Sequence, residues 1–394
     1  MEVIFLIGAI QAIFLSALLL AKKKKMIADI ILFACLMLAG IHLFSYYLYS
    51  IDVLKEYPFF NILAIYLPML EGALTYVYIR TMTSKQHRFN KINFLHAVPY
   101  LILTLVLFVM VFFNENSAVE SISEIYKNTP LFIEITSIFN SLLGPIYIVL
   151  SWRLLQKHKK NILQDFSYTE EIDLKWLKYV VILMGTIWVV VLAANVLSHF
   201  TQLITDKMAN DLIYYSVAIV IFLEGYFGIK QQVIYTPALK SEHKETKGTQ
   251  VNTIITGVKE NSRYEKSGLK KDESKKYLTD LLRFMEDDQP FTNGKLSLKE
   301  VATKLNVSTN YLSQVINENL NKNFFDFVNE YRVNLIKEKM KDPNHKQFTL
   351  LALAFDCGFN SKSNFNVIFK KHTGLTPTAY QKIFLVKTLI VSKI

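Results

Sequence analysis

Apolar residues are concentrated in the first 230 positions of the chain, where they form seven long runs separated by short polar connections. Each run has about the 20 residues that an α-helix needs to cross a hydrocarbon layer about 30 Å thick. Because no water is present there to satisfy backbone amides, helices are the expected spanning form. The pattern therefore predicts a seven-helix transmembrane bundle over residues 1–230. Its helices are expected at Val3–Ala21, Ile27–Tyr49, Phe59–Ile79, Ile92–Phe113, Leu131–Leu150, Tyr179–His199 and Leu212–Ile229.

The apolar spacing changes after residue 276 to that of water-soluble, amphipathic helices. Between Leu278 and Met285, apolar residues recur at i, i+3, i+4 and i+7, which gives a helix one buried face. Two pairs of short helices follow, and within each pair a tight turn separates the two helices. Ser308 and Ser361 stand where the second helix of each pair would begin, and their hydroxyls can cap it. This is the pattern of two helix-turn-helix units, which a long helix at Phe324–Met340 would join.

One polar face of each second helix remains after its apolar residues are buried. A second helix of this kind can lie in the major groove of DNA, with its polar side chains against the base edges. The outward residues are therefore candidate DNA contacts. They are Thr309, Asn310, Ser313, Gln314 and Asn317 in the first unit, and Lys362, Ser363, Asn366, Val367 and Lys370 in the second.

This part of the chain resembles the AraC/XylS-type transcription activators, whose DNA-binding domain has two helix-turn-helix units joined by a long helix. The similarity covers about Tyr277–Lys382 and includes YLSQVIN in the first unit and VNEYRVNLIK in the linking helix. Its most diagnostic stretch runs from Ala354 to Tyr380. The residues that fall there at the family's spacing are Asp356, Gly358, Phe359, Ser361, Phe365, Phe369, Lys370, Gly374, Pro377 and Tyr380.

The resemblance implies sequence-specific binding to double-stranded DNA at a promoter or operator. Neither second helix contains an arginine, the commonest partner of guanine, whereas Asn and Gln can pair with adenine. We therefore expect A/T-rich contact positions. The family's contacts carry over onto Asn310, Ser313 and Gln314 in the first unit, and onto Lys362, Ser363, Asn366 and Val367 in the second.

Two further segments complete the predicted organisation. Residues 231–276 are charged and poor in apolar residues, which predicts a flexible linker before the DNA-binding domain at 277–382. Residues 383–394 form an apolar tail that is too short to span a membrane. The tail is interpreted either as a helix packed on the domain or as an amphipathic contact with the membrane surface or a second domain. Seven apolar helices before an AraC-type domain resemble membrane-tethered regulators of Bacteroidetes-type bacteria.

Charge supports this division and predicts an orientation. Residues up to Ile229 include 17 Lys and Arg against 16 Asp and Glu, whereas the remainder has 27 against 17. The net charge of +11 therefore lies almost wholly in the second part, as expected of a DNA-binding domain. In the first part, 14 cations lie in the odd-numbered connections and 3 in the even ones. Because Lys and Arg are retained on the cytoplasmic side, the amino terminus is predicted outside and the DNA-binding domain in the cytoplasm of a bacterial inner membrane.

Glu71 is the ionisable residue placed deepest in an apolar run. Ionisable groups in hydrocarbon are costly, and they usually face a partner or a cavity. Two interpretations stay open: a sensor pocket for an unknown signal ligand, and a buried structural hydrogen bond. Pro68, three residues earlier, can open a kink beside it.

No zinc motif, paired cysteine ligands, phosphate-binding glycine loop or assignable catalytic Ser/His/Asp pattern is found, so no catalytic residue, metal site, cofactor or enzyme activity is predicted. The predicted function is that of a membrane-bound, one-component transcription regulator. A homodimer is compatible with it, since two linked domains bind DNA more tightly than one. The alternative is a multi-pass membrane receptor or carrier whose C-terminal helical domain mainly docks a protein.

Overall fold

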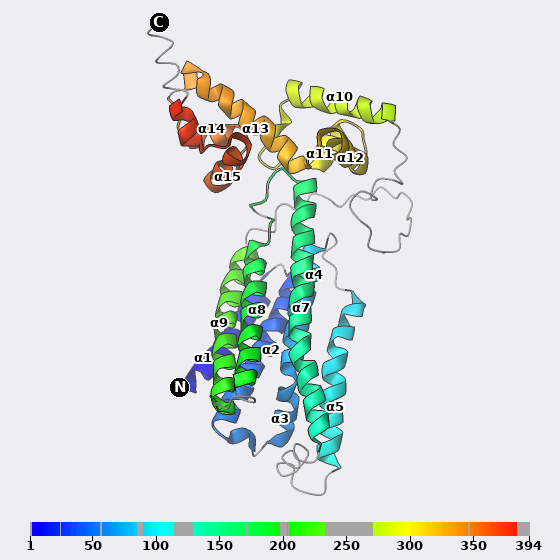
Figure 1. Ribbon diagram of the computed structural model, residues 1–394, viewed down its shortest axis with the longest axis vertical. Helices are drawn as coiled ribbons and strands as arrows, with labels where there is room; N and C mark the ends of the chain where they lie inside the picture. The colour runs from blue at the N-terminus through cyan, green and yellow to red at the C-terminus, as the bar shows by residue number, and fades with distance from the viewer. Residues whose placement is uncertain are drawn as a thin grey trace. The chain divides into compact units, whose positions relative to one another are not determined.

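The computed structural model describes residues 2–23, 25–55, 57–84, 90–113, 129–170, 172–197, 203, 205–232, 271–345 and 347–383. Across these residues the chain is all-α, and the only extended pairing is an isolated bridge. The chain divides into two compact units, one with residues 1–157 and 174–239 and the other with residues 158–173 and 240–394 (Figure 1). Most of the predicted linker and all but the first residue of the predicted apolar tail lie outside the described residues.

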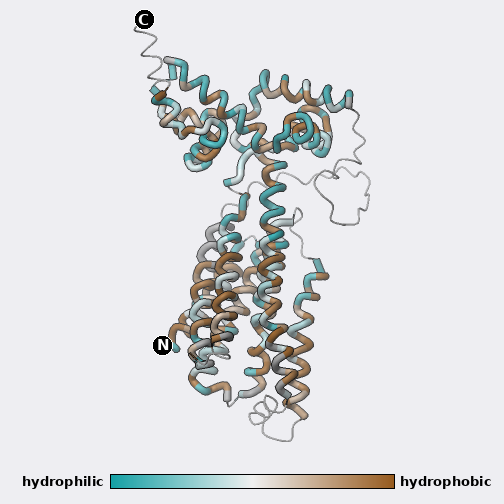
Figure 2. Tube along the Cα trace, viewed as in Figure 1, coloured by the Kyte–Doolittle hydropathy of each residue, from teal (hydrophilic) through white to brown (hydrophobic). Residues whose placement is uncertain are grey.

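The first unit consists of apolar helices that coincide in position with the seven predicted runs (Figure 2). Among the described residues, five are long and apolar enough to cross a membrane, or six if a bent pair counts as one span. The last run coincides with a helix whose apolar stretch, Asn210–Leu223, is shorter than a span. Seven spans therefore stay a prediction. The elements are α1 (Val3–Leu20), α2 (Ile27–Ser50), η1 (Val53–Lys55), α3 (Pro58–Ile65), α4 (Leu67–Thr83), η2 (Lys91–Ala97), α5 (Val98–Phe112), α7 (Pro130–Asp165), α8 (Lys175–Val196) and α9 (Asp206–Gln232).

Prolines interrupt two of the helices that the sequence predicts as continuous. The helix expected over Phe59–Ile79 is two helices, α3 and α4, bent by 45° at Tyr66. Pro68 explains the break, because it has no N–H to donate and its ring clashes with the carbonyl four residues earlier. Similarly, Pro99 lies in the first turn of α5, and the residues before that helix form the 3₁₀ helix η2 instead.

Small residues allow the helices of the first unit to approach closely. A Cβ on Gly40 of α2 would lie 3.1 Å from the Cβ of Ala12 on α1, so these two helices pack almost backbone to backbone. A Cβ on Gly144 of α7 would collide with the indole ring of Trp188 on α8. Close packing at small residues is the usual way in which helices associate where no water drives them together.

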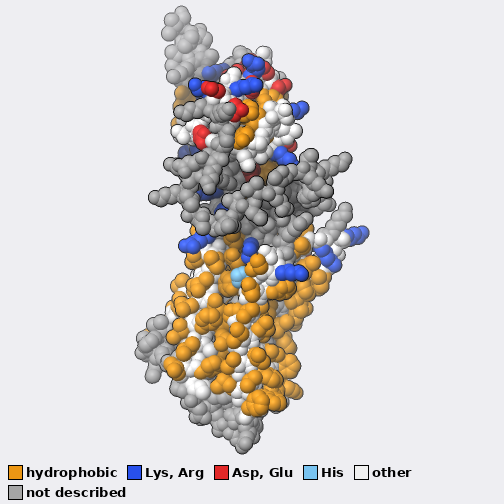
Figure 3. All heavy atoms as spheres, turned by 90° about the vertical axis from the view of Figure 1, so that its right-hand side faces the viewer, with side chains coloured by type: hydrophobic (Ala, Val, Ile, Leu, Met, Phe, Trp, Pro, Cys, Tyr) orange, Lys and Arg blue, Asp and Glu red, His pale blue; other side chains and the backbone are white. Residues whose placement is uncertain are grey.

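Large apolar side chains cover the outside of the first unit (Figure 3). Phe14 on α1 is 60% exposed, Leu105 on α5 61% and Val189 on α8 65%. Water-soluble monomers rarely expose apolar patches of more than a few hundred Å². The exposed surface of the first unit is therefore more apolar than that of a typical water-soluble monomer.

The second unit contains two small apolar cores that share one long helix, α13. The predicted linker ends earlier than expected, because α10 begins at Lys271 with Asp272 and Glu273 in its first turn, where acidic side chains stabilise a helix. The elements are α10 (Lys271–Asp287), η5 (Pro290–Thr292), α11 (Leu298–Lys304), α12 (Thr309–Leu320), α13 (Phe324–Lys341), η6 (Pro343–His345), α14 (Leu350–Asp356) and α15 (Lys362–Thr373).

Residues 158–173, here called the docked segment, belong to this second unit and not to the helical bundle predicted over residues 1–230. They comprise the last turns of α7 and the chain that follows. Leu163 packs against the core of the second helix-turn-helix unit, while Ile162, Tyr168 and Ile172 form a small apolar cluster of their own. These contacts explain why a mainly polar connection is folded into the domain.

Candidate functional site

Each helix-turn-helix unit sets the start of its second helix with a serine cap. The Oγ of Ser308 accepts a hydrogen bond from the Tyr311 N–H at 3.2 Å, and the Oγ of Ser361 accepts one from the Asn364 N–H at 3.2 Å. Gly358, at the turn of the second unit, has φ +93°, a conformation that favours glycine. Both predicted caps and the predicted glycine turn are confirmed.

The second helix of the first unit, α12, differs in part from the expected contact surface. Thr309 and Asn310 are exposed, and Ser313 and Asn317 are partly exposed. Gln314, however, is only 6% exposed, and its Nε2 donates to both carboxylate oxygens of Glu318 at 3.0 and 3.1 Å. The expectation of an outward-facing Gln314 is therefore not met. Gln314 lies on the same face of α12 as the partly buried Tyr311, three positions earlier, and not on the outer face.

The second helix of the second unit, α15, presents the expected face to solvent. Phe365, Ile368 and Phe369 are buried against α13 and α14, as the apolar pattern predicts. The polar positions lie at i, i+1, i+4 and i+8, which is one side of a helix. The candidate DNA contacts that are exposed on this side are Lys362, Ser363, Asn366, Val367 and Lys370.

Arg332 of α13 is the most completely buried charged side chain in the described part of the chain, at 1% exposure. Its Nε donates to the Phe291 carbonyl at 2.7 Å, and its Nη2 donates to the Asn293 carbonyl at 2.8 Å. Towards the docked segment, Nη1 donates to the Ser167 carbonyl at 3.0 Å and Nη2 to the Ser167 Oγ at 2.9 Å. The fifth bond goes from Nη1 to the Asn329 Oδ1 at 3.1 Å. A guanidinium has five N–H donors, and all five are therefore satisfied.

Burial lowers the pKa of the Arg332 guanidinium to about 10, and the negative charge of Glu170 opposes this shift. The group therefore stays protonated at neutral pH. No carboxylate among the described residues forms an ion pair with it. Its hydrogen-bond partners are neutral oxygen atoms, which replace the water lost on burial. Removal of the guanidinium would leave several buried carbonyls without donors, which is costly.

The docked segment is joined to the first helix-turn-helix unit by backbone contacts. Ser167 donates to the Leu296 carbonyl through its N–H at 3.1 Å and through its Oγ at 2.8 Å. The neighbouring Phe166 forms an antiparallel bridge with Ser297, the N-cap of α11. Ser167 is completely buried, and the Nδ2 of Asn329 also donates to its carbonyl at 3.1 Å. The sequence carries no motif that would reveal these contacts, because they use backbone groups of distant segments.

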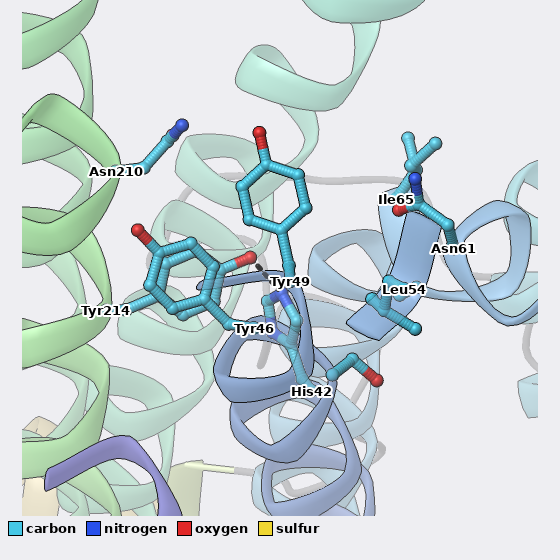
Figure 4. Close-up of a pocket in the computed structure, with 10 residues that line it drawn as sticks. His42, Tyr46, Tyr49, Leu54, Asn61, Ile65, Asn210 and Tyr214 are labelled. Carbon is cyan, nitrogen blue, oxygen red and sulfur yellow. Dashed lines mark hydrogen bonds between the residues drawn. The ribbon is translucent and has the colours of Figure 1, made fainter. Parts of the chain in front are cut away.

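Glu71 belongs to a polar cluster inside the first unit whose central member is His42. Its Oε1 lies 2.7 Å from the Nδ1 of His42, and the Nε2 of His42 lies 2.8 Å from the Tyr214 hydroxyl. An ionised Glu71 can only accept a hydrogen bond, so Nδ1 then carries the hydrogen. Figure 4 shows the rings of Tyr46 and Tyr214 face to face beside His42, with centroids 3.6 Å apart. The Tyr46 hydroxyl donates to Asp211 at 2.6 Å.

Two cavities adjoin this cluster. One of about 300 Å³ is lined by Glu71, Asn140 and Trp188 among others, and the Oδ1 of Asn140 is buried without a hydrogen-bond partner. The other, of about 420 Å³, is the pocket in Figure 4. His42 and Tyr214 line both. Within the described residues, no group of three or more His, Cys, Asp or Glu side chains could hold a metal ion.

Comparison with known proteins identifies the C-terminal part. Residues 301–383 match a family described as "Helix-turn-helix domain", which is a family of DNA-binding domains rather than of enzymes. A solved structure of a protein with unknown function from Listeria innocua is 31% identical, with a TM-score of 0.24, over 27% of this chain and 95% of that chain. No curated protein matches the chain. The family match supports a DNA-binding regulator of the AraC type.

Replacing Arg332 by Gln should destabilise the second unit by on the order of 3 kcal/mol, because buried carbonyls lose their donors. Hydrogen exchange of the full-length chain should show faster exchange of the amides of Ser167 and α13. Arg283→Gln is the matched control, since it removes the same charge from an exposed position on α10 and should change nothing. Equal protection in both variants would show that the guanidinium does not hold these segments together.

Proposed function

We propose that this protein is a membrane-bound, one-component transcription regulator. Its two helix-turn-helix units recognise promoter DNA, and its apolar helices anchor the chain and detect a signal. The observation that carries this proposal is the exposed polar face of α15, which lies within the matched helix-turn-helix region. The alternative, a receptor or carrier whose C-terminal domain docks a protein, would not require polar side chains on that face.

In this mechanism α12 and α15 enter the major groove on one side of the duplex, and α13 fixes the distance between them. Asn310 and Asn366 are the exposed side chains able to pair bidentately with adenine. Val367 is 65% exposed and cannot hydrogen-bond, so it would contact a thymine methyl. Lys362 and Lys370 would bind phosphates, which provide affinity without sequence information.

Selection from a random duplex library by the full-length chain in detergent should return sites that are A/T-rich at the contacted positions. Each mismatched base pair should cost about 1 to 3 kcal/mol, and affinity should fall steeply with salt. Half-sites dominated by G/C would contradict the proposed contacts. Failure to bind any duplex would instead favour the protein-docking alternative.

The two kinds of contact can be separated on the selected duplex. Asn366→Ala should lower affinity by about 1 to 3 kcal/mol and relax the preference at one base pair. Lys370→Ala should weaken binding to all duplexes alike. It should also reduce, by about one, the slope of the logarithm of the binding constant against the logarithm of the salt concentration. The same response to both substitutions would argue against direct base reading by Asn366.

We further propose that the apolar helices span a bacterial inner membrane with the amino terminus outside. The exposed apolar surface of the first unit supports lipid contact, and the distribution of Lys and Arg supports this orientation. The DNA-binding domain would then lie in the cytoplasm, where the chromosome is. A homodimer would strengthen binding to a two-part operator through a higher effective concentration.

Protease added to intact spheroplasts should leave residues 271–383 uncut, because the membrane shields them. After the membrane is opened, the same protease should cleave the exposed connections of this region. An epitope placed before Glu2 serves as the control and should be lost from intact spheroplasts. Cleavage of the C-terminal domain in sealed spheroplasts would exclude the proposed orientation.

The signal site is proposed at the cavity beside Glu71. In the described residues no Lys or Arg pairs with this carboxylate, whose one hydrogen-bond partner is His42. A ligand that carries a cationic or hydrogen-bond-donor group would complement Glu71 and the unpartnered Asn140 Oδ1, while its apolar part contacts Trp188. The bend at Tyr66 lies close by in sequence, so occupancy of the cavity could alter the angle between α3 and α4.

Glu71→Gln should change the set of genes that the protein controls, as measured by RNA sequencing across growth conditions, because the proposed ligand would lose its counter-charge. The variant Asn366→Ala serves as the reference for weakened promoter binding. Glu2→Gln, which removes a half-exposed carboxylate from the same unit, is the matched control and should behave as the parent. A Glu71→Gln profile equal to the parent in every condition would leave only the structural interpretation of this residue.

A further inference from the structure

The carboxylate of Glu170, in the docked segment, lies at the N-terminus of α15. Its Oε1 accepts a hydrogen bond from the Ser361 hydroxyl at 3.1 Å, and the same hydroxyl oxygen caps the helix by accepting from the Asn364 N–H. The start of a helix is electropositive and offers free N–H groups, which makes it a natural binding place for phosphate. An anionic side chain therefore already occupies the approach to this helix end.

In helix-turn-helix proteins the N-terminal residues of the second helix are those that meet DNA. Lys362 and Ser363 follow Ser361 directly and are exposed, so a duplex read by α15 would bring phosphates towards this helix end. Glu170 and a DNA phosphate carry like charges and would seek the same positive end. Their simultaneous presence is unfavourable at close range.

The rest of the docked segment holds Glu170 in this position. Ser167, three residues earlier, is completely buried between the Leu296 carbonyl and the Arg332 guanidinium. Phe166 pairs with Ser297 at the start of α11. The segment thus contacts the start of α11 in the first helix-turn-helix unit, the start of α15 in the second, and α13 between them.

We propose that the docked segment, residues 158–173, is an intramolecular inhibitor of DNA binding. Its Glu170 competes with DNA phosphate for the N-terminus of α15. This inference rests on the proposed DNA-binding function and adds to it a means of control. Because the segment contains the last turns of α7 and leads into α8, a movement of either helix would be transmitted to it along the chain. A signal that moves the segment away from α15 would raise the affinity for DNA. A signal that keeps the segment bound there would lower it.

The charge of Glu170 can be tested on the full-length chain in phosphatidylcholine nanodiscs, with the duplex selected by that chain and with a random-sequence duplex. Glu170→Gln should raise affinity for both roughly two- to tenfold, since one repulsive charge is lost. Glu170→Lys should raise it further and make the salt dependence steeper by about one phosphate contact. Asp287→Lys, an equal change of charge at an exposed position on α10, should give a smaller gain.

A disulfide between Phe166→Cys and Ser297→Cys can lock the segment, because side chains of paired antiparallel residues lie close together. The natural Cys35 and Cys357 are both buried and should not interfere. The oxidised chain should bind the selected duplex more weakly than the reduced chain. Addition of Glu170→Gln should restore much of the lost affinity.

Each failure has its own signature. If Glu170→Gln and Glu170→Lys bind no better than Asp287→Lys, and the oxidised lock binds as the reduced form does, the competition is overturned while DNA binding stands. If the parent chain binds neither duplex and these variants bind neither, the proposed function itself fails. Hydrogen exchange of α15 in each variant checks that the helix remains folded.

Discussion

The five hydrogen bonds of buried Arg332 hold together parts of the second unit that no single apolar core joins. The two helix-turn-helix units have separate cores, and α13 is the long element that contributes to both. Arg332 lies on that helix and binds η5 and the residue after it on one side and the docked segment on the other. A protein that binds two successive faces of the major groove needs its two recognition helices, here α12 and α15, at a fixed separation. The buried guanidinium thus supports the spacing on which sequence recognition would depend.

Local signals in the sequence were sufficient for much of the second unit. The caps at Ser308 and Ser361, the left-handed Gly358 and the buried face of α15 are all decided by residues within a few positions of one another. Such features follow from helix chemistry and from the spacing of apolar residues. The exposed face of α15 could be predicted for the same reason.

Other features depend on partners that are distant in sequence. Gln314 has the polarity of an outward residue, yet it is buried, although the one partner of its Nε2, Glu318, is only four positions away. The docked segment is polar enough to resemble a simple connection, and it is held by backbone carbonyls that have no sequence signature. The link from Glu71 to His42 and Tyr214 joins three helices, and periodicity alone does not specify which helices face one another. The break at Tyr66, in contrast, is indicated locally by Pro68.

Arg332 and Glu71 are accommodated by opposite means, and this contrast separates rigid from responsive parts. Arg332 satisfies every donor with neutral oxygens fixed by the fold. Its surroundings therefore favour a single arrangement. Among the described residues Glu71 has one hydrogen-bond partner, His42, which also lines two cavities. A carboxylate with one partner and a cavity beside it leaves room for a ligand that would stabilise it further. If the chain senses a signal, the weakly satisfied charge is where a small change in occupancy would alter the balance between states.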